Sequence, residues 1–343
     1  MLISIIITNY NYGEYLGECI DSCLQQEYAN KEIVIVDDGS NDDSREIIRR
    51  YRSPIKAIFK SNGGQASAFN AGFSACAGKL IIFLDSDDKL MPHCLNNVVQ
   101  NWRSSFSKIH FNLLMIGKSG SSLGETFCKR PLPCGDLKTL IIRDGNYQSM
   151  PTSGNVFSRS FLSRVMPMPE PDWRGHADAY LINLAPLVGG VGAIDEPLGY
   201  YRVHDKNISS HVLDSRIQFD KLYASIVREI KTDEVIDQFC KRNGFTYNRG
   251  ALINSYPHLQ RVMVYDKLAH LFKKSRFRRP LKDFYYMSMS LFRMRNVPVI
   301  KMALIHSWML LILTVPSRFA ESMVIFAYER GAILSERGRP RNS

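Results

Sequence analysis

The feature that most constrains the fold is a set of three short apolar runs, each of which ends in a polar cluster. The clusters are Thr8–Tyr12, Asp37–Ser40 and Asp85–Asp88. Buried parallel strands are near-continuous apolar runs, and ligands bind at the carboxyl ends of such strands. The arrangement therefore predicts an α/β fold with a mostly parallel sheet and a site at one edge.

The segments between these runs have helical periodicity, so strands and helices alternate over the first hundred residues. We expect strands at 3–8, 32–36, 55–59 and 80–84, and helices at 15–27, 44–51 and 65–75. Ser40 or Asn41 is expected to cap the helix at 44–51. Further helices are predicted at 92–102 and 177–187, with strands near 108–116 and ending near 203. Such alternation is typical of a sheet covered on both faces by helices.

Composition narrows the class of protein. An apolar content of 45% and a charged content of 22% are those of a folded globular chain, which excludes intrinsic disorder. Seven cysteines, an odd number without framework spacing, indicate reduced thiols in the cytoplasm. The first residues carry no basic segment or cleavage site, so they are interpreted as a buried strand and not as a signal peptide.

The basic charge is concentrated in the last part of the chain. Residues 1–210 carry a net charge of −1, and residues 211–343 carry +12. This asymmetry predicts a catalytic domain at 1–210 and a helical, basic C-terminal region at 211–343. That region contains basic blocks at 273–279 and 293–295, and 337–343 is predicted to be a disordered tail.

The cluster Asp85–Asp88 has the form of a site for metal and nucleotide. Asp85 and Asp87 lie on one side of an extended chain, so one can reach a ribose and the other a metal. A divalent cation held by carboxylates neutralises the charge that grows on a departing diphosphate. A turn that caps a helix is the alternative explanation.

The cluster that begins at Asp37 offers a second set of acceptors. Asp37 or Asp38 can accept the imide N–H of uracil or thymine, or a ribose hydroxyl. Tyr10 offers a ring on which a base can stack, and Asn9 and Asn11 offer amide contacts. A capped helix start and a packing tyrosine are the corresponding structural alternatives.

Four sequence blocks resemble the family 2 glycosyltransferases with the GT-A fold, over about residues 1–210. The blocks are 4–12, 33–42, 63–72 and 78–88. The resemblance implies a Rossmann-like, mostly parallel sheet flanked by helices. It also implies inverting transfer of a sugar from a nucleotide-sugar donor, with Mn²⁺ or Mg²⁺ as cofactor.

The resemblance also assigns roles to individual residues. Eight of them are implied to bind the donor or the metal: Thr8, Tyr10, Asp37, Asp38, Gln65, Asn70, Asp85 and Asp87. The first two border the nucleoside, and the pair of aspartates that follows binds base and ribose. The glutamine and the asparagine line the donor pocket, and the last two residues hold the ribose and the metal respectively.

The base of an inverting transfer is assigned to Asp178. In the family a carboxylate that opens a helix after the metal triplet takes the proton of the acceptor hydroxyl. The Glu-Asp pair that often supplies it is absent here, and Asp178 resembles the variant with a single Asp. The alternative is that Asp178 is a structural residue of the first helical turn, stabilised by the helix dipole. His176 is the rival candidate for the base.

A segment after 195 resembles the closing strand and loop of the family. His204 is expected to complete the metal shell or to contact the diphosphate, and Arg202 to neutralise phosphate charge. Asn155 matches a segment that often borders the acceptor.

The expected function is transfer of a hexosyl or N-acetylhexosaminyl group, with a UDP-sugar as the default donor. The acceptor is a hydroxyl of a glycan or a lipid-linked acceptor, in cell-surface polysaccharide or glycolipid assembly. The alternative is an inactive GT-A-like protein that binds a membrane or a partner through its basic tail. A nucleotidyltransferase would carry a Gly-rich, Arg-containing loop after the first strand, where this sequence has Thr-Asn-Tyr-Asn-Tyr-Gly. A processive synthase would carry several membrane spans and a Gln-x-x-Arg-Trp segment, and the sequence contains neither.

The C-terminal region is expected to make peripheral contact with an anionic membrane, at the inner face of the cell membrane. The apolar run at 302–315 is shorter than the ~20 residues that cross a bilayer, and a second apolar patch lies at 323–328. Packing on the catalytic domain or on a second subunit, and a true span, are the alternatives. No nucleic-acid recognition motif accompanies the basic residues, so a nucleic-acid partner is not expected.

Overall fold

The computed structural model describes residues 1–51, 55–204, 207, 212–213, 216–217, 219–269, 285, 287–289 and 299–329. The chain divides into two compact units. The first comprises Met1–Ile141 and Asn146–His204, and the second comprises Ile142–Gly145 and the described residues after His204. The basic blocks at 273–279 and 293–295 and the tail at 337–343 lie outside the described residues.

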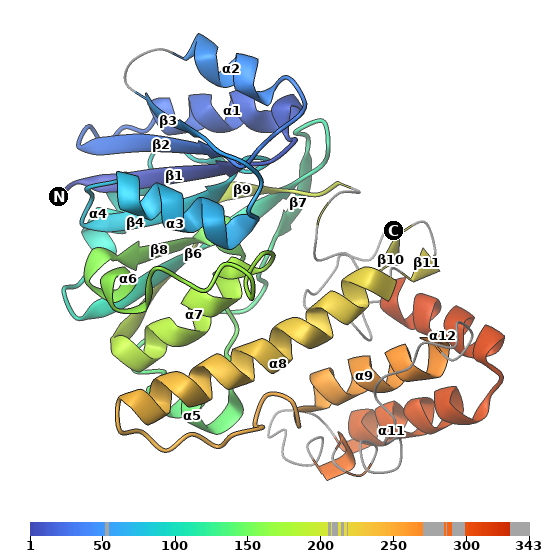
Figure 1. Ribbon diagram of the computed structural model, residues 1–343. Coiled ribbons are helices and arrows are strands. Elements are labelled where there is room, and N and C mark those ends of the chain that lie inside the picture. Colours follow the sequence, from blue (N-terminus) through green and yellow to red (C-terminus); the bar gives the residue numbers. More distant parts are fainter. Residues whose placement is uncertain are drawn as a thin grey trace. The chain divides into compact units, whose positions relative to one another are not determined.

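One mixed sheet of nine strands, counted over the described residues, forms the centre of the first unit (Figure 1). The strand order is β3-β2-β1-β4-β8-β6-β9-β5, and β7 pairs with β6. The strands are β1 (Ile3–Asn9), β2 (Lys31–Asp37), β3 (Ile55–Phe59), β4 (Leu80–Asp85), β5 (Lys89–Leu90), β6 (Phe106–Ile116), β7 (Ser122–Thr126), β8 (Asn155–Ser158) and β9 (Gly190–Arg202).

The first four strands are mutually parallel, as predicted for an α/β fold. The short strand β8 then lies antiparallel between β4 and β6, which makes the sheet mixed. Alternate residues of β1 face opposite layers. Ile3, Ile5 and Ile7 pack in a core with residues of α1 (Gly13–Leu24), whereas Ile6 faces Gly72 of α3 (Gln65–Ala75).

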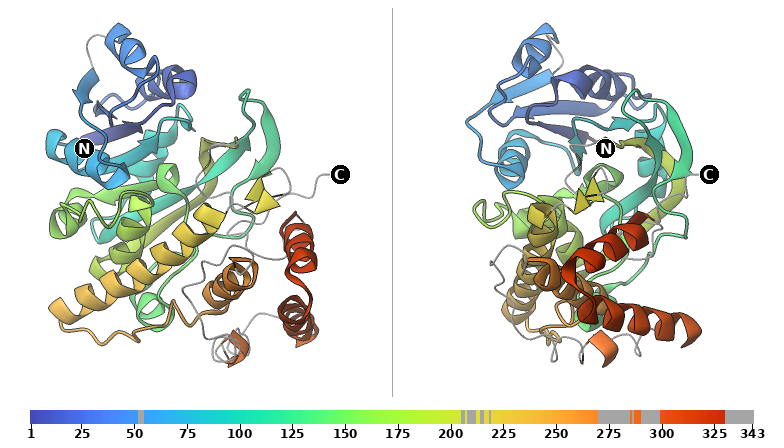
Figure 2. Two further views of the ribbon diagram at one scale, coloured as in Figure 1. Left: turned by 45° about the vertical axis from the view of Figure 1, so that its right-hand side comes forward. Right: turned by 90° about the vertical axis from the view of Figure 1, so that its right-hand side faces the viewer.

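The helices predicted at 15–27, 44–51, 65–75, 92–102 and 177–187 are confirmed within a few residues at each end. Helix α1 lies beside α2 (Figures 1 and 2). The remaining helices of this unit are α2 (Ser44–Arg50), α4 (Cys94–Asn101), α5 (Lys138–Asp144), the 3₁₀ turn η1 (Thr152–Gly154), α6 (Arg159–Val165) and α7 (Ala177–Val188), with α5 running into the second unit.

The predicted cap of α2 is wrong. The helix begins at Ser44 after Asp43, whose side chain makes no cap hydrogen bond, and Ser44 N donates to Asp42 Oδ1 at 3.1 Å. The Ser40 hydroxyl instead accepts hydrogen bonds from Asn9 Nδ2 at 3.1 Å and from Asn11 N at 2.9 Å. Ser40 is therefore used to join the loops after β1 and β2, and it is not available to the helix.

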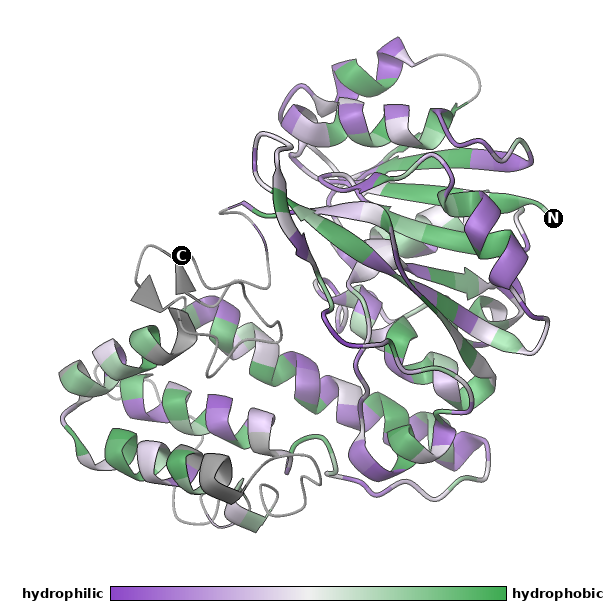
Figure 3. Cartoon of the chain, turned by 180° about the vertical axis from the view of Figure 1, so that it is seen from behind, coloured by the Kyte–Doolittle hydropathy of each residue, from purple (hydrophilic) through white to green (hydrophobic). Residues whose placement is uncertain are grey.

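The second unit is mainly helical where it is described. It contains a hairpin, β10 (Val212–Leu213) with β11 (Arg216–Ile217), and the helices α8 (Phe219–Arg242), α9 (Tyr256–Ala269), α11 (Val299–Thr314) and α12 (Ser317–Glu329). Apolar residues of all four helices form one core. Figure 3 shows the apolar character of α11. Among the described residues, no helix combines the length and the apolar character that a bilayer span requires.

We predict that Gly72→Ala destabilises the first unit. The added Cβ would overlap Ile6 Cγ2 of the buried strand β1 and lie 3.3 Å from Val36 Cγ2. Overpacking costs about 1–3 kcal/mol, and the overlap with a buried strand places the cost in the upper part of this range, above the ~1 kcal/mol gained by placing alanine in a helix. Urea denaturation should show a loss of about 1 kcal/mol or more. Gly175→Ala is the control, because its Cβ meets no atom within 4 Å; equal midpoints for both variants would contradict the prediction.

Candidate functional site

Polar residues from three neighbouring strands meet at one edge of the sheet. β1 pairs in parallel with β2 and β4, and the registers place Asn9 opposite Asp37 and Thr8 opposite Asp85. Since the three strands end at the same level, the loops that follow them emerge side by side. The polar clusters that the sequence places after these strands are therefore neighbours in the fold.

Asp37 is fully buried and fixes the end of β2. Its Oδ1 accepts from Asn9 Nδ2 at 3.1 Å, and its Oδ2 accepts from Ser40 N at 3.2 Å and from Arg45 Nε at 2.9 Å. These donors come from the last residue of β1, the turn after β2 and helix α2. The carboxylate thus holds three segments together behind the strand ends.

Asp38 organises the glycine loop that precedes α3. Its carboxylate accepts from Lys60 Nζ at 2.6 Å and from the backbone N–H groups of Gly63 and Gly64, the latter at 2.7 Å. Gly64 has φ +87°, and a Cβ there would overlap Arg174. Glycine is required here both by the backbone conformation and by the close approach of the segment before α7.

Gln65 links the start of α3 to the start of α7. Its backbone N–H donates to Arg174 O at 2.7 Å, and its Oε1 accepts from Ala177 N at 2.8 Å. Because the amide oxygen is used in this way, the amide nitrogen is the donor that bonds Asp85. One side chain therefore connects the aspartate turn with the helix that carries Asp178.

Asn70 makes a similar connection one turn later in α3. Its Oδ1 accepts from Met168 N at 3.0 Å, and its Nδ2 donates to Met168 O at 3.0 Å and to Glu170 Oε1 at 3.1 Å. Asn155 at the start of β8 is buried, and its Nδ2 donates to carbonyl oxygens of the turn before it, Pro151 O at 2.6 Å among them. Both amides hold segments of the chain in place.

The aromatic residues of the first loop differ in exposure. Thr8 is half-buried, and Tyr10 exposes 45% of its surface, which leaves its ring accessible. Burial raises the pKa of Tyr12, and the charges of Asp87 and Asp85 raise it further. Tyr12 stands in the same polar cluster as Tyr10, but the sequence pattern alone did not indicate a role for it.

Asp85 lies within electrostatic reach of two other carboxylates, Asp87 and Asp178. Burial raises the pKa of Asp85 well above its ordinary value, and the charges of Asp87 and Asp178 raise it further. Hydrogen bonds from Thr152 and Gln65 act in the opposite direction. The fold thus brings the predicted base close enough to the predicted donor and metal residues for its charge to act on Asp85.

His204 is held directly against Asp87. Its Nε2 lies 2.9 Å from Asp87 Oδ2, and the side chain is 3% exposed. The imidazole stacks on Tyr15, with ring centroids 5.3 Å apart and an interplanar angle of 19°, and Tyr12 flanks it at 5.5 Å. Packing between aromatic rings therefore fixes the orientation of the ring nitrogen toward the aspartate turn.

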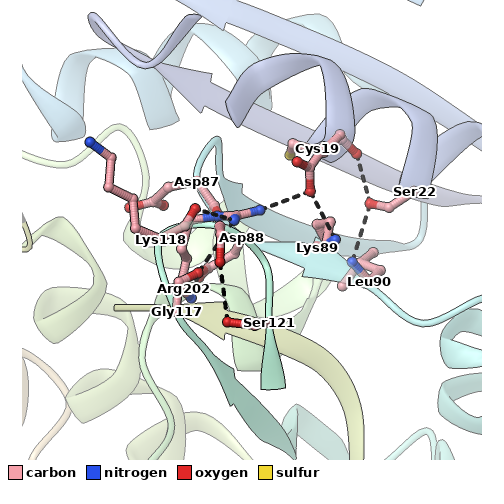
Figure 4. Close-up of polar contacts among 12 residues, drawn as sticks. Cys19, Ser22, Asp87, Asp88, Lys89, Leu90, Gly117, Lys118, Ser121 and Arg202 are labelled. Carbon is pink, nitrogen blue, oxygen red and sulfur yellow. Dashed lines mark hydrogen bonds and ion pairs between the residues drawn. The ribbon is translucent and has the colours of Figure 1, made fainter. Parts of the chain in front are cut away.

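Arg202 is a buried cation that braces the aspartate turn (Figure 4). Its Nε donates to Asp87 O, its Nη1 to Lys118 O and its Nη2 to Glu18 Oε2, each at 2.9 Å. Its backbone N–H donates to Asp88 Oδ1, also at 2.9 Å. The guanidinium is engaged by the chain itself, whereas the sequence suggested a contact with phosphate.

The N-terminal end of α7 carries both candidate bases. Asp178 lies half-buried in the first turn, and its Oδ1 accepts from Ala179 N at 2.9 Å. His176 precedes the helix with φ 62°, in the left-handed region that a histidine adopts at a cost. Strained backbone of this kind concentrates at functional sites.

The residues at the aspartate turn fit a divalent cation by their chemistry. Within the ranges that the structure covers, no three or more His, Cys, Asp and Glu side chains are arranged as a metal cluster. Asp87 and His204 offer an oxygen and a nitrogen 2.9 Å apart, and Asp85 is a further carboxyl group that senses the charge of Asp87 through its raised pKa. Mg²⁺ and Mn²⁺ take one or two carboxylates and complete their shell with phosphate and water oxygens.

Comparison with known proteins identifies close relatives over most of the chain. Residues 4–114 match the family model described as glycosyl transferase family 2. An uncharacterized glycosyltransferase of Nostoc sp. is 35% identical over 266 residues, which cover 76% of this chain and 81% of the relative. Another, from Rickettsia typhi, is 40% identical over 269 residues, which cover 74% of this chain and 82% of the relative.

A solved structure with a similar fold is S. aureus TarS 1-349 in complex with UDP-GlcNAc. The TM-score is 0.54 at 16% sequence identity, and the match covers 96% of this chain and 92% of the other. At this identity the likeness shows the fold, which is the GT-A arrangement of a central sheet flanked by helices.

We predict that Arg202→Lys destabilises the protein by about 2–4 kcal/mol. A lysine ammonium cannot donate in the three directions that the guanidinium serves, so buried carbonyl groups lose their donor. The free energy of unfolding from urea titration measures the effect. Arg143→Lys is the control, because its ion pair with Asp144 is exposed and contributes little. A similarly small change for Arg202→Lys would contradict the structural role.

Proposed function

The chain belongs to the family 2 glycosyltransferases with the GT-A fold, and we propose that it transfers a sugar from a UDP-sugar to a hydroxyl acceptor with inversion. The observation that carries the proposal is that two further carboxylates act on Asp85 at the end of β4: Asp87 in the turn that follows, and Asp178 in the first turn of α7. Carboxylates beside a donor site supply the two needs of the reaction, a metal ligand and a base.

The donor is proposed to lie over the loops that follow β1, β2 and β4. The exposed ring of Tyr10, with Thr8 beside it, is suited to border the base. Asp37 and Asp38 support the base and ribose through the loops they fix, and Asp85 is directed to the ribose. UDP-GlcNAc in the TarS complex makes a UDP-linked hexose or N-acetylhexosamine the first donor to test.

Gln65 and Asn70 are proposed to line the same pocket from α3. Each joins α3 to the segment that leads into α7, through Ala177 N and Met168 respectively. Their contribution to the donor site is therefore to hold the two sides of the pocket at a fixed spacing.

Asp87 and His204 are proposed to hold Mn²⁺ or Mg²⁺. The support is their 2.9 Å contact, the packing of His204 on Tyr15 and the closeness of Asp85, whose pKa the charge of Asp87 raises. The chemistry that such a cation supplies when bound is neutralisation of the charge that develops on the leaving diphosphate.

Asp178 is proposed as the base. It is a half-buried carboxylate in the first turn of α7, and its charge acts on Asp85. It would take the proton of the acceptor hydroxyl while that oxygen attacks the anomeric carbon from the face opposite the diphosphate. His176 remains the rival base, and the variants below separate the two.

We predict that Asp87→Asn removes metal-dependent donor binding and that Asp178→Asn spares it but stops transfer. Thermal stabilisation by a panel of nucleotide sugars, with and without Mn²⁺, measures binding, and release of nucleoside diphosphate measures turnover. Loss of the base should lower turnover by about 10²–10⁴-fold. Asp136→Asn, at an exposed carboxylate, is the control.

His176→Asn tests the rival base, because asparagine also tolerates a positive φ. It should retain most of the turnover. Normal transfer by the Asp178→Asn protein would defeat the base assignment. Absence of metal-dependent release from every common donor would instead favour an inactive GT-A-like binding protein.

The helical second unit is proposed to contact an anionic membrane, where a glycan or lipid-linked acceptor for cell-surface polysaccharide or glycolipid assembly would lie. Leu304, Leu310, Leu311 and Phe319 of α11 and α12 are exposed, with Leu304 at 66%. The net charge of +12 after residue 210 suits an anionic surface. All seven cysteines are free thiols, which suits the reducing inner side of the cell membrane.

We predict that the protein floats with vesicles of phosphatidylglycerol and phosphatidylcholine but not with phosphatidylcholine alone. Leu304→Ser combined with Leu311→Ser, seven residues apart on one helix face, should reduce flotation several-fold. Leu123→Ser, at an exposed leucine of β7, is the control. Self-association in size-exclusion chromatography without vesicle binding would assign the apolar face to a second subunit.

A further inference from the structure

A lysine in the middle of the sheet has no part in the chemistry described so far. Lys108 of β6 is 0% exposed, and its Nζ donates to Tyr147 OH at 2.8 Å and to Ser149 Oγ at 2.5 Å. Over the described residues it forms no ion pair with a carboxylate. Burial lowers the pKa of Lys108 well below its ordinary value, and the charge of Asp178 opposes this. A buried amine of this kind is costly, so stability alone does not explain it.

Lys108 is linked to α7 through Tyr147, which bonds a backbone carbonyl of that helix. This carbonyl has no donor within the helix, because the residue four positions later is a proline. Pro186 lies inside α7 and has no N–H, so it cannot donate to the carbonyl of Ile182 four residues earlier. Tyr147 OH donates to that carbonyl at 3.2 Å. Its single proton is used there, so the Tyr147 oxygen accepts from Lys108.

Lys108 is also the donor in its hydrogen bond with Ser149. Burial lowers the pKa of His110 to about 2, so the ring is neutral, and its Nε2 donates to Pro133 O at 3.0 Å. The hydroxyl of Ser149 then donates to His110 Nδ1 at 3.3 Å or to Asn155 Oδ1 at 3.4 Å. In either case the Ser149 oxygen accepts from Lys108, so Lys108 acts as the donor in both of these hydrogen bonds.

We propose that Lys108 and Tyr147 are positioning residues for Asp178, and that they act by bracing α7 where Pro186 interrupts its hydrogen bonds. Asp178 and Ile182 are four residues apart and lie on one face of the helix. The brace therefore reaches the face that carries the base, one turn away from it. The inference rests on the assignment of Asp178 in the proposed function.

The physical reason for a brace is the precision that proton transfer demands. A displacement of about 1 Å between reacting groups can cost about 10²-fold in rate. The missing hydrogen bond at Pro186 weakens α7 within two turns of Asp178. Ser107 Oγ, the neighbour of Lys108 in β6, donates to Ala185 O at 2.7 Å, so the same strand also holds the end of the helix.

The test uses Lys108→Met and Tyr147→Phe in the full chain, with UDP-GlcNAc and Mn²⁺ as the probe donor. Hydrogen exchange followed by mass spectrometry should show faster exchange in peptides from α7 and unchanged exchange in α3. For UDP release, kcat should fall about 10- to 100-fold, while KM for the donor stays within about 2-fold.

Tyr247→Phe is the matched control. Tyr247 is buried in the second unit and donates to Asp233 Oδ1 at 2.6 Å, so its variant loses a comparable buried hydrogen bond. It should leave exchange in α7 and kcat unchanged.

Unchanged exchange in α7 of both variants would overturn the inference, and so would an equal loss of kcat in Tyr247→Phe. A rise in KM with kcat preserved would also overturn it, since the effect would then lie on the donor. If the wild-type chain releases no UDP from any donor, the proposed function fails, and exchange in α7 alone decides whether the brace exists.

Discussion

The shared end level of β1, β2 and β4 is the constraint on which the rest of the site depends. Their parallel register brings Asn9, Asp37 and Asp85 to one edge, and with them a concentration of carboxylates that would repel one another. The chain offsets part of this charge internally, since Asp37 pairs with Arg45 and Asp38 with Lys60. The aspartate turn, where a cation is proposed to bind, is contacted instead by His204 and by the backbone N–H of Arg202.

Residues late in the first unit hold the loops that follow the early strands in place. Arg202 and His204 hold the aspartate turn, and the segment around Arg174 caps the start of α3 through its carbonyl groups. Gln65 then joins both regions by bonding Ala177 and Asp85. The site is thus a meeting of loops whose spacing is set by buried hydrogen bonds, which suits a reaction in which donor and base must be held in line.

The strands and helices of the first hundred residues could be predicted because apolar runs and turn residues alternate there without interruption. The four-residue strand β8 could not, since so short a segment has no periodicity to detect. Helix-capping preferences also misassigned Ser40, because its hydroxyl accepts from Asn11 N in the loop after β1 and does not cap α2. The role proposed for Lys108 could not be predicted from the sequence, because lysine is normally a surface residue and its burial is evident only in the fold.

The distance along the chain between Asp87 and Arg202 has a consequence for synthesis. The two residues are joined by a hydrogen bond across 115 positions. During translation the β1–β4 strands emerge well before the arginine that braces their aspartate turn, and contacts of such long range form late. A nascent chain interrupted before β9 would lack the buried guanidinium that donates to Asp87 O and Lys118 O, so its aspartate turn would not yet be held in place.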